Sequence, residues 1–167
     1  MDLFLIRHAE ALPLGQGSAT DADRPLSSRG QTQARGLGQY FKTSAIHLER
    51  ILSSPLLRAR QTAEEMRSEM GSEAPPLAVS EALAPGGKRR KLARFLREFG
   101  ATPLAVVGHQ PDLGLFAGWL IGSKKAQIEL AKGGLAKITC PEGLRKAGGA
   151  LIWLLKFAEC KAPESQA

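Results

Sequence analysis

Hydrophobic residues fall in two alternating patterns along the chain. Short, nearly continuous apolar runs separate longer segments in which apolar residues recur at helical spacing. Short runs of this kind, bounded by turn residues, are typical of buried strands. The predicted strands cover residues 3–6, 50–53, 77–79 and 104–107, with two more over 135–140 and 150–157. At least one of the last two is expected to pair antiparallel.

Three segments between these strands predict amphipathic helices whose apolar stripes face a core. The stripes are Ala34, Leu37 and Phe41; Ala59, Ala63, Met66 and Met70; and Leu92, Phe95, Leu96 and Phe99. Gly71 and Gly100 stand where the second and third helices should end, because glycine readily adopts the C-cap conformation. The polar, Gly-rich segment from Leu12 to Arg24 has neither period, which predicts a loop near the site.

The alternation of strands and helices predicts a three-layer α/β/α sandwich with a mostly parallel central sheet. The chain has 167 residues, enough for one domain with a substantial core. We expect a single domain over residues 1–160 and a frayed tail over 161–167.

Ligands of such sheets bind beyond the carboxyl ends of the strands. The loops at that edge carry Arg7 and His8 after the first strand, Ser54, Pro55 and Arg58 after the second, and Gly108, His109 and Gln110 after the fourth. Two of the three histidines and two arginines are thus predicted to share one edge. The third histidine, His47, has no such neighbours and is expected to have no catalytic role.

The formal net charge of +7 changes this picture little. Basic residues are scattered and aromatic residues make up 5% of the chain, so no stacking platform or recognition helix for nucleic acid is predicted. The one dense run, Lys88 to Lys91, is interpreted as a solvated first turn of a helix; the alternative is a positive rim that attracts an anionic substrate.

Other features bound the function further. The apolar start is interrupted by Arg7 and His8, too early for a signal peptide or membrane span, so a cytoplasmic protein without membrane contact is expected. Cys140 and Cys160 lie outside any Cys-x-x-Cys pattern, which predicts neither a disulfide framework nor a zinc site. No metal or cofactor is expected.

The residues gathered at the sheet edge suit phosphoryl transfer. A neutral imidazole can attack phosphorus if fixed cations offset the charge of the phosphoryl group. At about 4 Å and an effective dielectric constant of about 20, each arginine–phosphate contact has a Coulomb energy of roughly 4 kcal/mol before desolvation. Positioning and electrostatics would therefore carry most of the catalysis.

Four motifs resemble those of the histidine phosphatase superfamily. Leu5 to Glu10 is similar to its Arg-His-Gly signature, with Ala9 at the third position. Residues 24–30, 53–62 and 107–111 are similar to the segment leading into the first helix and to the second and third signatures. The resemblance implies a phosphoglycerate mutase-like fold and a metal-independent phosphatase. It makes His8 the nucleophile that becomes phosphorylated, with Arg7 and Arg58 holding the phosphoryl oxygens. His109 would be the second pocket histidine, cationic when phosphate is bound.

One departure indicates a branch. Mutases and sugar phosphatases of the family carry an acid in a Leu-x-Glu context after the third strand, where this chain has Pro85. The segment instead resembles the short protein-phosphohistidine phosphatases, whose leaving group, an imidazole with a pKa of about 6.5, needs less help from an acid. The resemblance implies a partner that displays phosphohistidine, such as a phosphotransfer protein of a signalling relay. The remaining candidate proton donors, Glu81, Glu10 and Asp112, are interpreted first as structural caps or ion-pair partners.

Two alternatives stay open. The chain could be a phosphomonoesterase for a small phosphate, with Asp112 or Glu10 as the acid. It could also be a non-catalytic module that binds phosphohistidine or another polyanion, although four intact pocket residues argue against this.

Overall fold

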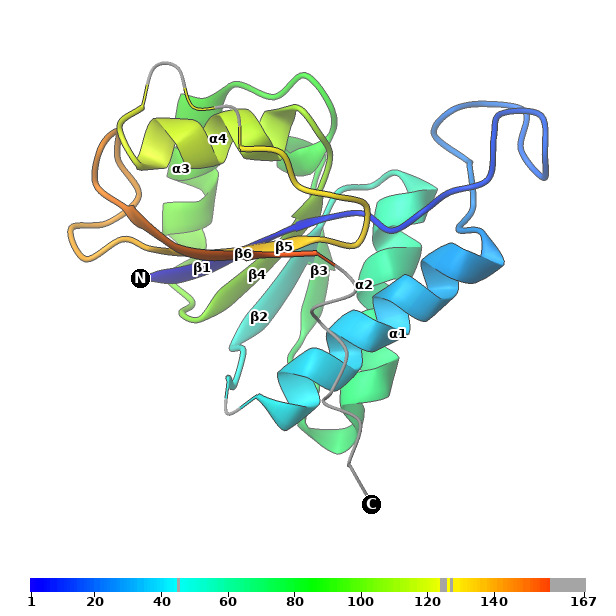
Figure 1. The fold of residues 1–167 in the computed structure, drawn as a ribbon. Helices are drawn as coiled ribbons and strands as arrows, with labels where there is room; N and C mark the ends of the chain where they lie inside the picture. The colour runs from blue at the N-terminus through cyan, green and yellow to red at the C-terminus, as the bar shows by residue number, and fades with distance from the viewer. Residues whose placement is uncertain (45, 124–125, 127, 157–167) are drawn as a thin grey trace.

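The computed structural model describes residues 1–44, 46–123, 126 and 128–156, which form one six-stranded sheet with helices on both faces (Figure 1). The strands are β1 (Asp2–Arg7), β2 (Arg50–Ser53), β3 (Leu77–Val79), β4 (Leu104–Gly108), β5 (Leu135–Thr139) and β6 (Ala150–Leu155). The helices are α1 (Ser28–Thr43), α2 (Leu57–Met70), α3 (Arg89–Phe99) and α4 (Asp112–Leu120), with short 3₁₀ turns η1 (Gly71–Glu73) and η2 (Glu81–Leu83). The predicted sandwich and its strands are confirmed, within one or two residues at their ends.

The sheet is mostly parallel. Its strand order is β3-β2-β4-β1-β5-β6, and β3, β2, β4 and β1 pair in parallel. β5 pairs antiparallel with β1, and β6 pairs antiparallel with β5, so the predicted antiparallel pairing is also confirmed. The carboxyl ends of β2, β4 and β1 therefore lie side by side at one edge.

Side chains of the central strands alternate between two separate hydrophobic cores, one on each face of the sheet. Leu3 and Leu5 of β1 pack with α3 and α4 on one face, whereas Phe4 and Ile6 pack with α1 and α2 on the other. All four are fully buried. A strand buried on both faces reads as a continuous apolar run, which explains the pattern of residues 3–6.

One close approach and one capping hydrogen bond fix the start of α1. A Cβ on Gly30 would lie 1.9 Å from the carbonyl oxygen of Glu10, so only glycine lets α1 start this close to the loop after β1. Ser27 caps the helix, its hydroxyl accepting the N–H of Gly30 at 3.0 Å. The motif over residues 24–30 thus packs the start of α1 against the loop that follows β1.

The three predicted amphipathic helices are confirmed as α1, α2 and α3, and the structure adds a fourth helix, α4, which the sequence did not predict. In its sequence, DLGLFAGWL, Asp112 is the one charged residue, so no polar face marks a helical period. A helix that is apolar all round is a buried helix. Gly114 shows how tightly it packs, because a Cβ there would lie 2.0 Å from the carbonyl oxygen of Ile128.

The structure also describes the predicted helix ends and one of the two cysteines. Gly71 and Gly100 both adopt positive φ at the C-caps of α2 and α3, as predicted. Cys140 is fully buried. Cys160, the expected tail over 161–167 and residue 157 of the last predicted strand lie outside the described residues. Within the described part of the chain, no helix is long and apolar enough to cross a membrane.

Candidate active site

The four predicted pocket residues meet at the carboxyl edge of the sheet. His8 follows β1, and its backbone N–H donates to the carbonyl oxygen of Gly108 at the end of β4 at 2.9 Å. The rings of His8 and His109 consequently lie with their centroids 5.2 Å apart. Arg58, in the first turn of α2, places its Nε 3.3 Å from Nε2 of His8, and Arg7 is the last residue of β1.

The ring of His8 is held in one tautomer by the backbone of Ala9. Its Nδ1 lies 2.7 Å from the carbonyl oxygen of Ala9. A carbonyl oxygen only accepts hydrogen bonds, so Nδ1 carries the proton and Nε2 presents a lone pair. Burial, reinforced by the positive charges of Arg58 and Arg7, lowers the pKa of His8 from 6.5 to about 4, against the opposing effect of the Ala9 hydrogen bond. The imidazole is therefore neutral near pH 7.

This protonation state can be measured directly. In an NMR titration of ¹⁵N-histidine-labelled protein, the ring of His8 should stay neutral, with its proton on Nδ1, down to a midpoint near pH 4. A signal that disappears in His8→Asn assigns the resonance. A midpoint at or above pH 6, or a proton on Nε2, would contradict this protonation state of His8.

Arg58 is held in place by the predicted loop from Leu12 to Arg24. Its side chain is 93% buried, and its Nη1 and Nη2 donate to the backbone carbonyl of Asp21 at 2.6 Å and to its carboxylate at 3.0 Å. The carboxylate also accepts from Arg24 at 2.9 Å, and that bond, with the charge of Arg58, holds the pKa of Asp21 below its ordinary value. The loop is thus near the site, as predicted. Asp21 itself was missed, because an aspartate in a Gly-rich loop carries no distinguishing pattern.

Arg7 keeps part of its guanidinium available. Nη1 donates to the carbonyl oxygen of Leu130 at 2.9 Å, which ties the segment before β5 to the site. Its Nε is buried and has no hydrogen-bond partner within the described structure. An unsatisfied buried N–H donor is costly, so this group is well suited to receive an anionic oxygen.

His109 is positioned by Ser54, which the sequence placed in the same edge without assigning it a role. The two are buried, and Nε2 of His109 lies 2.7 Å from Oγ of Ser54. Nδ1 is buried without a partner in the described part of the protein, which leaves it for a ligand. Burial, with the charges of His8 and Arg58, lowers the pKa of His109 to about 3. His109 is therefore neutral before substrate binds, and the expected cationic form would require the charge of a bound phosphoryl group.

Removing the Ser54 hydroxyl tests this positioning. In Ser54→Ala, His109 loses the hydrogen bond that orients its ring, and we expect kcat to fall by about 10-fold with KM changed less. Ser53→Ala is the matched control, because the Ser53 hydroxyl donates to the backbone of Ser54 rather than to the histidine. An equal loss in the two variants would mean that the effect is structural.

Two residues of the second motif join α2 to the neighbouring loops. The hydroxyl of Thr62 accepts the N–H of Ala9 at 3.0 Å and donates to the carbonyl of Arg58 at 2.6 Å. The side chain of Gln61 accepts the N–H of Leu26 at 2.8 Å. These bonds fix the loop after β1 relative to Arg58, and so set the distance between His8 and its neighbouring cation.

The three candidate proton donors lie in different surroundings. Glu10 accepts from the hydroxyl of Ser27 at 3.0 Å, beside the start of α1. Asp112 accepts the backbone N–H of Gly86 at 2.8 Å. Glu81 is exposed in η2. Glu10 and Asp112 thus have the structural contacts that the sequence analysis favoured for them.

Beyond Arg7 the site opens into a cleft of about 500 Å³ lined by Gln110, Leu115, Ile128 and Glu129, among others. Glu129 is an exposed carboxylate that sequence reasoning missed, because it follows no motif. His47 is exposed and lines a separate, small cavity. No cluster of three or more histidine, cysteine, aspartate or glutamate side chains suited to a metal ion occurs among the described residues.

The sequence and the fold agree with those of known proteins. The sequence pattern of the histidine phosphatase superfamily (branch 1) matches residues 3–84. The chain belongs to the histidine phosphatase superfamily. Membership indicates a phosphatase, a hydrolase whose pocket binds phosphate or a related oxyanion.

Three similarities define the relationship more finely. The chain is 39% identical over 150 residues to an uncharacterized protein of Picosynechococcus sp., covering 83% of this chain and 88% of that one. It is 30% identical over 117 residues to phosphohistidine phosphatase SixA of Escherichia coli, covering 68% and 70% of the two chains. A structure of the protein histidine phosphatase SixA complexed with tungstate matches with a TM-score of 0.81 and 25% identity, over 96% of this chain and all of that one. The predicted branch, the short SixA-like proteins, is confirmed.

Proposed function

We propose that this protein removes phosphate from phosphohistidine on another protein, through a phosphorylated His8. The observation that carries the proposal is the state of His8, a neutral imidazole with its lone pair on Nε2 beside the guanidinium of Arg58. The similarity to SixA, a phosphohistidine phosphatase, supports the substrate class.

In the first step, Nε2 of His8 attacks phosphorus and forms a P–N bond as the P–N bond of the substrate breaks. When the substrate ring carries a proton on its other nitrogen, it leaves as neutral imidazole with its electron pair. Charge is conserved, because His8 gains the phosphoryl group and becomes an N-phosphorylated imidazolium. Its Nδ1–H, already donated to Ala9, stabilises that cation.

In the second step, water attacks the same phosphorus and displaces His8. The new P–O bond forms as the P–N bond breaks, both protons of the water leave with phosphate as H₂PO₄⁻, and the lone pair returns to Nε2. Arg7, Arg58 and His109 would hold the three equatorial oxygens through both transfers, offsetting charge where it is greatest.

The proposed reaction needs no carboxylic acid as proton donor, and the carboxylates near His8 are engaged in other contacts. Neutral imidazole is a good leaving group, so no carboxylic acid is needed to protonate it, whereas a sugar alkoxide needs one. Pro85 stands where the related phosphatases carry their acid, and Glu10 and Asp112 are engaged in structural hydrogen bonds. The site thus fits a P–N bond better than a P–O bond.

A substrate panel tests the proposal. We expect kcat/KM for a phosphohistidine peptide to exceed that for glucose 6-phosphate by at least about 100-fold, the lower bound of what a general acid contributes. An aryl phosphate, whose leaving group needs less protonation, should fall between them. A sugar phosphate hydrolysed faster than the peptide would contradict the proposal.

One observation favours the second candidate, a phosphomonoesterase for a small phosphate. The cleft of about 500 Å³ beside Arg7 suits a small metabolite, and Glu129 lines it as an available acid. If Glu129 protonated an alkoxide, Glu129→Gln would lower the rate on a sugar phosphate by about 100-fold. Under the phosphohistidine proposal, the same variant keeps its rate on the peptide within a few-fold.

A further inference from the structure

The start of α3 carries cations where helices favour acids. Residues 88–91 read Lys-Arg-Arg-Lys, and all four are exposed. The N-cap, Lys88, makes no side-chain bond to the helix, and the first turn contains no acidic residue. Cations at a helix N-terminus oppose the helix dipole and lower stability. Local residues that lower the stability of the fold without improving its packing are common at binding sites.

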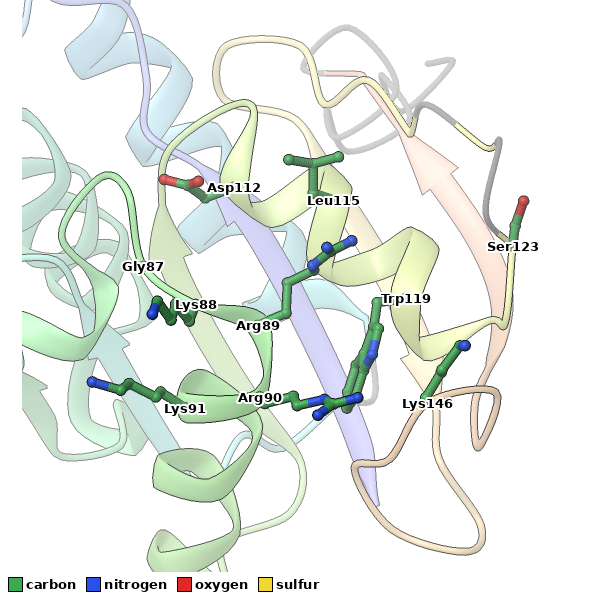
Figure 2. A pocket seen from close by; sticks show the side chains of 10 residues that line it. All are labelled: Gly87, Lys88, Arg89, Arg90, Lys91, Asp112, Leu115, Trp119, Ser123 and Lys146. Carbon is green, nitrogen blue, oxygen red and sulfur yellow. The ribbon is translucent and has the colours of Figure 1, made fainter.

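These cations line a groove of about 770 Å³ between α3 and α4 (Figure 2). Lys146 lines its other side, and Leu115 and Trp119 of α4 supply apolar surface. Leu115 is 45% exposed, and the ring of Trp119 stacks on that of Phe116 with centroids 6.0 Å apart. Figure 2 shows Arg89 and Arg90 reaching from α3 toward α4. We call this feature the α3–α4 groove.

The cations of the groove form no ion pair with the described part of the protein. They are Lys88, Arg89, Arg90, Lys91 and Lys146. Asp112 is the one acid that lines the groove, and its carboxylate accepts the N–H of Gly86. The groove therefore presents a strong positive potential to solvent.

The groove adjoins two cavities that are lined by active-site residues. Leu115 lines both the groove and the cleft that contains Arg7. Asp112 lines both the groove and a small cavity that reaches His109. A ligand with its phosphoryl group at His8 would therefore have the groove beside it along α4.

We propose that the α3–α4 groove binds an acidic segment of the protein substrate, next to the phosphohistidine in sequence. This inference rests on the proposed function and specifies its substrate. Exposed arginines beside a half-buried tryptophan are typical of protein interfaces, which favours a polypeptide over a nucleic acid. From Asp112 to Trp119, α4 extends about 10 Å at 1.5 Å per residue. An extended peptide covers that length in about three residues, so the groove accommodates about three consecutive substrate residues.

Two synthetic phosphohistidine peptides test the groove. One carries glutamate at the third to sixth positions on both sides of the phosphohistidine, and the other carries glutamine there. The wild-type protein should show kcat/KM about 10-fold higher for the glutamate peptide at low salt. At 1 M salt, where the Debye length is about 3 Å, this ratio should fall to within about twofold of unity.

The variant Arg89→Glu/Arg90→Glu should abolish the preference for glutamate. Acids in the first turn suit the helix dipole, so the unfolding temperature should be unchanged or higher. The control is Lys42→Glu/Arg94→Glu, which makes the same change in net charge at exposed cations outside the groove. It should keep the preference.

Three results would overturn the inference. They are equal rates for the two peptides in the wild-type protein, an equal loss of preference in the control, and tighter binding of a single-stranded oligonucleotide than of the glutamate peptide in the groove. In each case the phosphohistidine peptides would still be hydrolysed. Failure of the proposed function looks different, because the wild-type protein would then hydrolyse neither peptide.

Discussion

Replacing His8 with alanine is expected to lower kcat on a phosphohistidine peptide by more than about 10⁴-fold, because the attacking nitrogen is lost while the pocket remains. His8 follows β1 and belongs to neither hydrophobic core, so the fold should survive the change. Steady-state rates and the circular dichroism spectrum measure the two effects separately.

His47→Ala is the matched control for the nucleophile. It removes another histidine from an exposed position away from the pocket and should leave kcat within about twofold. If His8→Ala kept a rate near that of His47→Ala, His8 would not be the nucleophile and the mechanism would be wrong.

Arg58→Lys should lower kcat/KM by about 100- to 1,000-fold, the loss typical of removing one preorganised donor. Lysine keeps the positive charge, but it cannot bridge His8 and Asp21 with a planar fork as Arg58 does. The measurement therefore separates the geometry of the guanidinium from its charge.

Arg60→Lys provides the control, two residues further along α2. Arg60 is exposed, and its ion pair with Glu64 is long at 3.8 Å. We expect no change beyond about twofold, as for most surface substitutions. If the Arg58→Lys variant had activity close to that of the control, a positive charge alone would suffice at this position.

The sheet and the main pocket residues were predictable because they depend on local patterns. Continuous apolar runs marked β1 and β4, and the rule for parallel sheets brought the residues after them, His8 and His109, to one edge. The motif around Arg58 supplied the third element. Each of these signals lies within about ten residues of sequence.

What the sequence missed depends on tertiary contacts. α4 has no polar face because it is buried on most sides, so its period is invisible. Asp21 and Ser54 matter through partners 37 and 55 residues away in the chain, Arg58 and His109. Neither contact follows from composition or spacing. The neutral state of His109 is likewise set by burial and by neighbouring charges that only the fold brings together.

The phosphoenzyme on His8 is the central claim, and trapping it is the most direct test. Wild-type protein mixed with excess phosphohistidine peptide should be quenched in alkali, where phosphohistidine is stable, and analysed by intact and peptide mass spectrometry. The account predicts one phosphoryl group per chain, located on His8 and absent from His8→Ala. Turnover with no phosphorylated His8 at any time point, or with the label on another residue, would contradict it.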